Sequence, residues 1–318
     1  MATMKFSVII PVYKNESSIP RLLQTLTDMN RQLDGELEVV FVVDGSPDQS
    51  FALLRAALRT MDVPAQLLAH SRNFGSFPAI RTGLAAARGD FFGVMAADLQ
   101  EPPELLVEFF RSLDGDECDV AIGTRASRSD PYFSRMASGM FWWLYRRLVV
   151  PEMPAGGVDV FGCNRVFRDQ LLQLEESRSS LIALIFWLGF RRKIVSYGRR
   201  VRQEGKTAWT FRKKVDYMMD SIFAFTDYPI RLLTKIGIAG FMLSSILGGI
   251  VLVGRLSNSI DVPGYATVMI VIMFFGTLNL FGLGLVGTYA WRAYENSKKR
   301  PLAVISVRQK NSIQSYAE

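Results

Sequence analysis

Apolar and polar positions follow two alternating patterns over the first 125 residues of the chain. Short apolar runs, most of them rich in Val or Ile, recur between longer segments whose apolar positions have helical spacing. The pattern predicts strands at residues 6–12, 39–43, 66–69, 91–96 and 120–123, with helices at 17–32, 50–61 and 77–87. Such alternation predicts an α/β fold in which a mostly parallel sheet is flanked by helices.

The last third of the chain carries two long uncharged segments, residues 236–254 and 266–291. Each is long enough to cross a hydrocarbon core of about 30 Å, which needs about 20 helical residues. Lys and Arg are denser on the outer flanks of these segments than in the loop between them. The positive-inside rule therefore predicts two transmembrane helices with both termini in the cytoplasm.

Three segments connect these two regions. Residues 181–190 are apolar but too few to span a membrane, so they predict a buried helix. Residues 191–214 hold ten Lys or Arg against one Glu, and residues 211–229 place apolar side chains at helical spacing. We predict an amphipathic helix in the headgroup plane, with a surface helix packed on the core as the alternative. The position of the basic run favours anionic lipid over nucleic acid, so no nucleic-acid partner is expected.

Composition limits the chemistry available to the chain. It has 318 residues, a formal net charge of +7, two cysteines and one histidine. Cys118 and Cys163 cannot form a disulfide framework or a zinc site alone, so a reducing compartment is expected. Because His70 is the single histidine, a metal site with several histidines is excluded. A lone histidine is more often structural than catalytic. No signal-peptide pattern occurs at the N terminus, so we expect the catalytic region to stay on the side where it is made.

Four parts of the chain follow from these patterns. They are a catalytic domain at 1–210, a juxtamembrane helix at 211–229, a two-helix transmembrane domain at 230–295 and a basic cytoplasmic tail at 296–318. Gly240, Ser244 and Gly248 form a ladder of small residues that suits close helix packing. The ladder could join the two spans or several protomers, and the second alternative would make a homo-oligomer.

Two acidic residues come directly after predicted strands. Asp98 and Gln100 could supply the protein ligands of a cation on a diphosphate, because Mg²⁺ takes one or two carboxylates plus substrate phosphates. Capping of a helix that begins near Pro102 explains the same residues equally well. Asp44 could accept hydrogen bonds from a nucleoside, and the alternative is an ordinary Asp-Gly-Ser turn.

The motifs together resemble the family-2 glycosyltransferases with a GT-A fold. Within that family they are similar to the polyprenyl-phosphate branch, which contains dolichol-phosphate mannose synthases and bactoprenol glucosyltransferases. The resemblance covers residues 5 to about 225, and the two spans match the bactoprenol enzymes in particular. It rests on Pro11-Val12-Tyr13-Lys14-Asn15-Glu16, Asp44-Gly45-Ser46, Ser71-Arg72-Asn73-Phe74-Gly75 and Asp98-Leu99-Gln100-Glu101-Pro102-Pro103.

The resemblance implies roles for individual residues. The nucleotide sugar would be bound by Pro11, Tyr13, Glu16, Asp44, Asn73 and Arg202. Asp98 and Gln100 would hold a divalent cation, Mg²⁺ or Mn²⁺, with the diphosphate. Arg125 would face the acceptor phosphate, with Arg128 and Arg135 nearby, and Asp159 would lie near the reacting centre. The catalytic residues would thus be Asp98, Asp159 and Arg125.

The sequence departs from the family pattern at three points. Val43 and Ala96 stand where the family usually has the first acid of its two acidic motifs. Thr207-Ala208 stands in place of the usual Ser-Lys, with Lys206 displaced. One metal carboxylate is therefore missing, which should affect metal affinity more than activity, since diphosphate and water can complete the coordination shell.

The resemblance implies an inverting, metal-dependent transfer of a hexose to a polyprenyl phosphate, giving a lipid-linked monosaccharide. Glucose from UDP-glucose is the expected donor sugar, at the cytoplasmic face of a bacterial inner membrane. The acceptor needs no strong base, since the second pKa of a phosphate monoester is about 6. The alternatives are another donor such as GDP-mannose, or a catalytically weak transferase-like membrane scaffold. A processive synthase would need more spanning helices than two.

Overall fold

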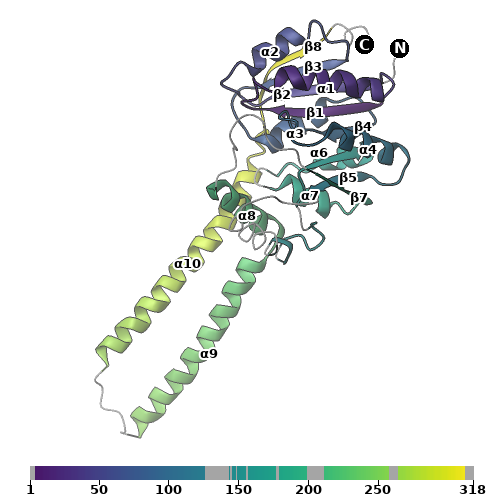
Figure 1. The fold of residues 1–318 in the computed structure, drawn as a ribbon. Helices are drawn as coiled ribbons and strands as arrows, with labels where there is room; N and C mark the ends of the chain where they lie inside the picture. Colours follow the sequence, from purple (N-terminus) through teal and green to yellow (C-terminus); the bar gives the residue numbers. More distant parts are fainter. Residues whose placement is uncertain are drawn as a thin grey trace.

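The computed structural model describes residues 4–125, 143, 145–147, 149–154, 157–176, 179–198, 211–257 and 264–311. An α/β domain carries two long helices that extend away from it (Figure 1). The strands are β1 (Phe6–Val12), β2 (Leu37–Val43), β3 (Ala65–His70), β4 (Phe91–Val94), β5 (Val120–Arg125), β6 (Val160–Asn164), β7 (Arg192–Tyr197) and β8 (Ile305–Lys310). The helices are α1 (Ile19–Gln32), α2 (Ser50–Ala57), α3 (Ser76–Ala86), α4 (Pro103–Asp114), α6 (Arg165–Gln173), α7 (Leu181–Trp187), α8 (Phe211–Phe225), α9 (Tyr228–Leu256) and α10 (Tyr265–Ser297).

The strands form one mixed, mostly parallel sheet in the order β7-β5-β6-β4-β1-β2-β3-β8. β1 runs parallel to β2 and β4, β2 runs parallel to β3, and β5 runs parallel to β7. β6 is antiparallel to β4 and β5, and β8 is antiparallel to β3. The predicted α/β class, a GT-A-type mostly parallel sheet flanked by helices, is confirmed. The five strands predicted in the N-terminal part are confirmed, with shifts at their ends.

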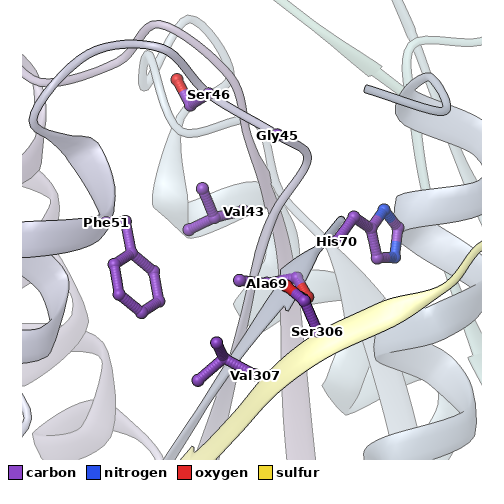
Figure 2. Close-up of a pocket in the computed structure, with 8 residues that line it drawn as sticks. All are labelled: Val43, Gly45, Ser46, Phe51, Ala69, His70, Ser306 and Val307. Atoms are coloured by element: carbon purple, nitrogen blue, oxygen red, sulfur yellow. The ribbon is translucent and has the colours of Figure 1, made fainter. Parts of the chain in front are cut away.

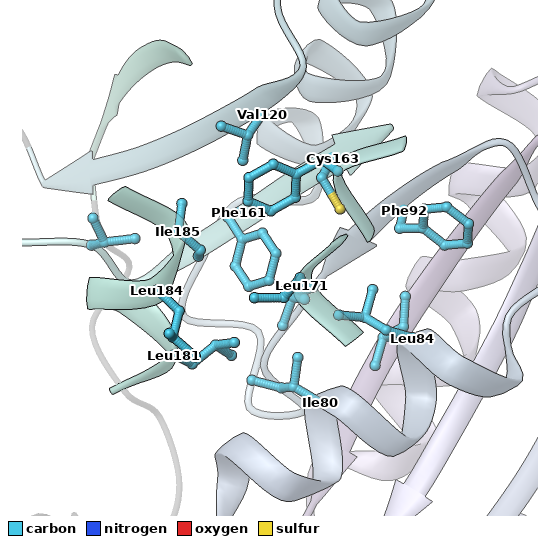
Figure 3. Close-up of a cluster of buried hydrophobic side chains, with 14 of the residues drawn as sticks. Ile80, Leu84, Phe92, Val120, Phe161, Cys163, Leu171, Leu181, Leu184 and Ile185 are labelled. Carbon is cyan, nitrogen blue, oxygen red and sulfur yellow. The ribbon is translucent and has the colours of Figure 1, made fainter. Parts of the chain in front are cut away.

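Both faces of the central strands are buried, which explains their continuous apolar runs. In β2, Phe41 packs with Leu22 and Leu26 of α1 on one face of the sheet. Val42 points to the other face, where it joins a cluster with Leu84 of α3. Figure 3 shows this second cluster, in which α6 and α7 add further apolar side chains. The buried helix predicted at residues 181–190 is found as α7.

A buried polar network ties together the starts of the first three strands. Glu38 of β2 is fully buried, and its carboxylate accepts hydrogen bonds from Ser7 Oγ at 2.8 Å and Gln66 Nε2 at 2.9 Å. The backbone N–H of Arg88 donates to the same carboxylate at 2.8 Å, and the N–H of Gly89 donates to Ser7 Oγ. Each partner is buried or partly buried, so loss of the carboxylate would leave several donors without an acceptor.

The two C-terminal helices form a hairpin beyond the α/β domain (Figure 1). Tyr228–Leu247 of α9 and Val271–Ser297 of α10 are long and apolar enough to cross a membrane, by length and composition. Gly240 faces Phe275 of α10, whose ring would lie 3.3 Å from an added Cβ. At Gly240, the small-residue ladder therefore allows close contact between the two helices of one chain.

Helix α8 lies where the hairpin meets the α/β domain (Figure 1). Arg292 of α10 forms an ion pair with Asp220 of α8 at 2.6 Å, and its guanidinium lies over the ring of Phe223. The rings of Phe223 and Tyr289 meet edge to face, 5.2 Å apart. These contacts fasten the end of α10 to α8, in the segment where an amphipathic helix was predicted.

The chain returns to the sheet after the hairpin of α9 and α10. Within the segment assigned to a basic tail, β8 pairs with the edge strand β3. Asn311, at the end of β8, accepts from the N–H of Ala65 at 3.1 Å and donates to the carbonyl of Val63 at 2.7 Å. The sequence analysis did not predict this strand, because it is short, basic and paired with residues far away in the sequence.

We expect Glu38→Ala to destabilise the α/β domain by about 3 kcal/mol or more, since it leaves several buried donors unsatisfied. Glu38→Gln should cost less, because the amide keeps the shape and one acceptor oxygen. Chemical unfolding of the detergent-solubilised protein measures the difference. Glu176→Ala, at an exposed position, is the matched control. Equal stability of Glu38→Ala and the control would show that the network contributes nothing.

Candidate functional site

Those predicted site residues that the structure describes lie at one edge of the sheet, where the parallel strands end. Ligands of open α/β sheets bind beyond these carboxyl ends. Tyr13, Asp44 and Asn73 follow β1, β2 and β3, which are neighbours in the sheet. Asp98 follows β4, the strand on the other side of β1, and Arg125 ends β5. The fold therefore brings the described candidates to a common edge.

The carboxylate of Asp44 is buried and turned toward the protein. Its Oδ1 lies 2.8 Å from Nδ1 of His70 and accepts from the N–H of Phe74 at 2.9 Å. Its Oδ2 accepts from the N–H of Gly75 at 2.7 Å. The other ring nitrogen of His70 lies 3.0 Å from Thr82 Oγ1 of α3. Asp44 and His70 thus hold the segment after β3 in place, and both nitrogens of His70 are engaged within the protein.

Gly45 is required by geometry at the turn after β2. Its φ of +57° is unfavourable for residues with a side chain. An added Cβ would lie 2.3 Å from the carbonyl carbon of Arg72 and 2.4 Å from the nitrogen of Asn73. The two motif loops are therefore packed backbone against backbone. Asn73 is exposed at the surface of this contact.

Hydrogen bonds also join the loop after β1 to the loop after β2. The N–H of Lys14 donates to Ser46 Oγ at 2.8 Å, and the N–H of Glu16 donates to Asp48 at 3.1 Å. Glu16 in turn accepts from the N–H of Gln49 at 2.9 Å, just before α2. Glu16 and Tyr13 are both exposed, but the carboxylate of Glu16 already accepts a hydrogen bond from the protein.

Asp48 organises this junction and was missed in the sequence analysis. Burial alone would raise the pKa of its carboxyl, but hydrogen bonds from Ser46, Ser50 and the N–H of Glu16 hold that pKa below the ordinary value. An acid just before a predicted helix is the signal that could have identified it.

A cavity of about 280 Å³ opens beside the Asp-Gly-Ser turn (Figure 2). Val43, Phe51 and Ala69 give it apolar walls, and Ser46 adds a hydroxyl. The other lining residues are Gly45, His70, Ser306 and Val307, of which the last two belong to β8. Val43, one of the departures from the family pattern, thus forms part of an apolar wall.

The segment after β4 turns sharply at Leu99, whose φ is +53°. The backbone N–H of Gln100 lies 3.4 Å from Asp98 Oδ1, while the Asp98 side chain is half-buried and that of Gln100 is buried. Pro102 occupies the N-cap position of α4, with no side-chain capping bond. Side-chain capping of α4 therefore does not explain Asp98.

Metal coordination at this segment would depend on the substrate. The described part of the chain contains no group of three or more His, Cys, Asp or Glu side chains placed to hold a metal ion. Asp98 and Gln100 supply one carboxylate and one amide oxygen from a single turn. This donor set fits a cation that arrives with a diphosphate, since such cations keep waters and bind phosphate oxygens.

Arg125, Asp159 and Tyr197 form a cluster at the ends of β5 and β7. Arg125 donates to Asp159 through Nε at 2.5 Å and through Nη2 at 2.7 Å, and Tyr197 donates its hydroxyl to Asp159 at 2.8 Å. Arg125 and Tyr197 are register partners in the β5–β7 pair. The structure thus pairs two predicted residues with each other and adds Tyr197, which the sequence analysis missed.

Three predicted residues, Arg128, Arg135 and Arg202, lie outside the described residues. The other predicted residues fall into two groups along the same edge of the sheet. One group follows β1, β2 and β3, and the other follows β4 and includes Arg125 and Asp159.

Comparison with known proteins places the chain among glycosyltransferases. The family model of glycosyl transferase family 2 matches residues 7–174. A putative glycosyltransferase, CsbB, of Bacillus subtilis is 32% identical, over 93% of this chain and 89% of its own length. The bactoprenol glucosyl transferase of Shigella phage SfV is 28% identical, over 95% of this chain and 98% of its own.

Among solved structures, the similarity includes glucosyl-3-phosphoglycerate synthase from Mycobacterium tuberculosis, in complex with Mn²⁺, UDP and glucosyl-3-phosphoglycerate. It covers 70% of this chain and 78% of that chain, with a TM-score of 0.48 and 16% sequence identity. A likeness at this level adds nothing about the site.

We expect Gly45→Ala to loosen the contact between the loops after β2 and β3, because the added Cβ would collide with backbone atoms. Amide exchange at Phe74 and Gly75, whose N–H groups bond to Asp44, should become faster than in the wild type. Hydrogen-exchange mass spectrometry measures this. Gly35→Ala is the matched control: its φ is +80°, but nothing lies within 4 Å of an added Cβ. Equal exchange in the two variants would contradict the packing argument.

Proposed function

The chain belongs to glycosyltransferase family 2, and we propose that it transfers a hexose from a nucleotide diphosphate to a polyprenyl phosphate. The observation that carries this proposal is the extent of the match to proteins named bactoprenol glucosyl transferases, which cover 95% of this chain. A match of that extent includes the part that forms α9 and α10. Glucose from UDP-glucose is the donor that we propose first, and GDP-mannose is the alternative.

The nucleoside would bind at the loops after β1, β2 and β3. Tyr13 and Asn73 are exposed there, and Pro11 is half-buried at the end of β1. Asp44 would act mainly by fixing the loop that carries Asn73, because its carboxylate already has three partners in the protein. Its role in the donor site is therefore better described as support than as direct contact.

The diphosphate would lie beside Asp98, which follows β4, the neighbour of β1 in the sheet. Asp98 and Gln100 would hold a divalent cation, Mg²⁺ or Mn²⁺, together with the phosphate oxygens. Such a cation supplies positive charge for the leaving diphosphate. Asp98 is the acid that remains of the pair usual in this motif, since Ala96 replaces the first.

The acceptor phosphate would lie against Arg125. It is largely dianionic at neutral pH, so alignment with the sugar carbon matters more than proton removal. Asp159 is engaged by Arg125 and Tyr197, which suits an orienting role better than that of a free base. We propose a single displacement that inverts the anomeric carbon. Retention of configuration in the product would exclude it.

We propose that the hairpin of α9 and α10 crosses the membrane, with the catalytic domain (1–210) and both termini in the cytoplasm. Trp291 and Tyr294 are exposed near the end of α10 that faces the α/β domain. Lys298 lies over both rings, within 5.1 Å of their centroids. Aromatic and basic side chains of this kind are enriched at the membrane–water interface. The juxtamembrane segment 211–229 would then lie at the headgroups, between the domain and the spans (230–295).

We expect purified wild-type protein to convert a labelled nucleotide sugar and a polyprenyl phosphate into a chloroform-extractable monosaccharide lipid. Asp98→Ala should lower turnover by about 100-fold or more, because it removes the carboxylate that holds the cation. Asp62→Ala, at an exposed bend before β3, is the control and should keep its activity. Turnover is measured with a panel of donors and thin-layer separation of the product.

The outcomes separate the alternatives. Unchanged turnover in Asp98→Ala would overturn the role of that residue. The absence of labelled lipid with every donor would favour a membrane scaffold, and a polymeric product would favour a processive synthase.

A further inference from the structure

The ends of β5 and β7 and the residue before β6 carry three polar side chains that contact one another. Arg125 and Tyr197 face each other in register, and the backbone N–H of Asp159 bonds to the carbonyl of Gly123 at 3.3 Å. Oδ2 of Asp159 accepts both from Nε of Arg125 at 2.5 Å and from the hydroxyl of Tyr197 at 2.8 Å. One carboxylate oxygen is thus shared between a cation and a phenol.

We infer that Tyr197 is a positioning residue of the acceptor site: it holds Asp159 so that Arg125 presents its remaining N–H groups to the phosphate of the lipid acceptor. This inference rests on the proposed function. Tyr197 itself would not touch the substrate; it acts through Asp159 and Arg125.

Arg125 has enough N–H groups to pair with Asp159 and to bind a phosphate at the same time. A guanidinium has five N–H groups in a fixed fork, and the bidentate pair with Asp159 uses one on Nε and one on Nη2. Among the described residues, no further side-chain hydrogen bond of Arg125 is found, which leaves Nη1 and the second hydrogen of Nη2 for an anion. Because the paired side fixes the plane of the guanidinium, the remaining groups point in a defined direction.

The charged part of the cluster is partly open to solvent, and its phenol is not. The side chains of Arg125 and Asp159 are 22% and 19% exposed, whereas Tyr197 is buried. A phosphate could therefore reach the guanidinium without displacing Tyr197.

The hydroxyl of Tyr197 stays protonated in these surroundings. Burial raises the pKa of Tyr197 far above its ordinary value, and the neighbouring carboxylates of Asp159 and Glu101 raise it further, against the opposing effect of Arg125. The phenol is therefore protonated at neutral pH and can donate its hydrogen bond to Asp159.

Loss of the Tyr197 hydroxyl would change the orientation of the ion pair between Asp159 and Arg125. Without the phenol, the guanidinium of Arg125 is the remaining described side-chain donor to Oδ2, so Asp159 is no longer held from β7 and the direction of the ion pair is less well fixed. Arg125 would then bind the acceptor phosphate less well. The donor side of the site, at the ends of β1, β2 and β3, should be unaffected because it lies on other strands.

Binding measurements on the full-length, detergent-solubilised protein test this inference. We expect Tyr197→Phe to weaken the binding of geranyl phosphate about tenfold, as expected for loss of a hydrogen bond to a charged group. Binding of UDP-glucose should change less than about twofold, within the range for sites without shared partners. Isothermal titration gives both constants, and geraniol, which lacks the phosphate, shows how much of the binding depends on that group.

Tyr145→Phe is the matched control, since the Tyr145 hydroxyl is also buried and lies within 3.4 Å of Ser180 and Ser221. It should lower the melting temperature while leaving both binding constants unchanged. If Tyr197→Phe fails to fold, Asp159→Asn replaces it: loss of the charge that orients the guanidinium should also weaken geranyl phosphate binding, with UDP-glucose binding changed less than about twofold.

Each outcome has one meaning. A selective loss of geranyl phosphate binding supports the inference, even if no transfer is observed with any donor. Equal effects on both ligands, or none on geranyl phosphate, would overturn it while leaving the proposed function standing. Failure of the wild type to bind geranyl phosphate would overturn both the proposed acceptor and this inference.

Discussion

The arrangement of the donor-side loops depends on one buried carboxylate, that of Asp44. It accepts hydrogen bonds from a histidine on β3 and from two backbone N–H groups just beyond that strand. The turn that carries it can approach the next loop only because Gly45 has no side chain. This contact fixes the position of the loop that carries Asn73, and Gly45 also lines the cavity beside Val43. Asp44, which the sequence suggested as a ligand contact, thus acts first as a support within the protein.

The sequence predicted the strands and helices that have continuous apolar runs or clear helical periodicity. β1 to β5, α7 and the two long helices have continuous apolar runs or clear periodicity, because both faces or one broad face are covered. β6, β7 and β8 were not predicted. β7 lies within a basic run that resembles a lipid-binding segment, and β8 is a short edge strand. Their pairing is non-local, so the local pattern carries little information about it.

The candidate site was predicted at the level of its motifs, and less well at the level of contacts. The sequence identified Asp44, Asp98, Arg125 and Asp159 from their positions after strands and from the family resemblance. It did not predict the ion pair between Arg125 and Asp159 or the hydrogen bonds of Asp48 and Tyr197. Those contacts join residues that are distant in the chain. The structure also removed helix capping as an explanation of Asp98.

The return of the chain to β8 has a consequence for biosynthesis. The edge of β3 is covered by residues that follow it by about 240 positions, after both long helices. During translation β3 therefore remains an open edge until the hairpin has left the ribosome, and open edges invite pairing with other chains. Completion of the sheet is thus delayed until the apolar helices have been made. A nascent chain that loses only its last residues would carry every predicted catalytic residue, yet would never close the sheet beside the cavity.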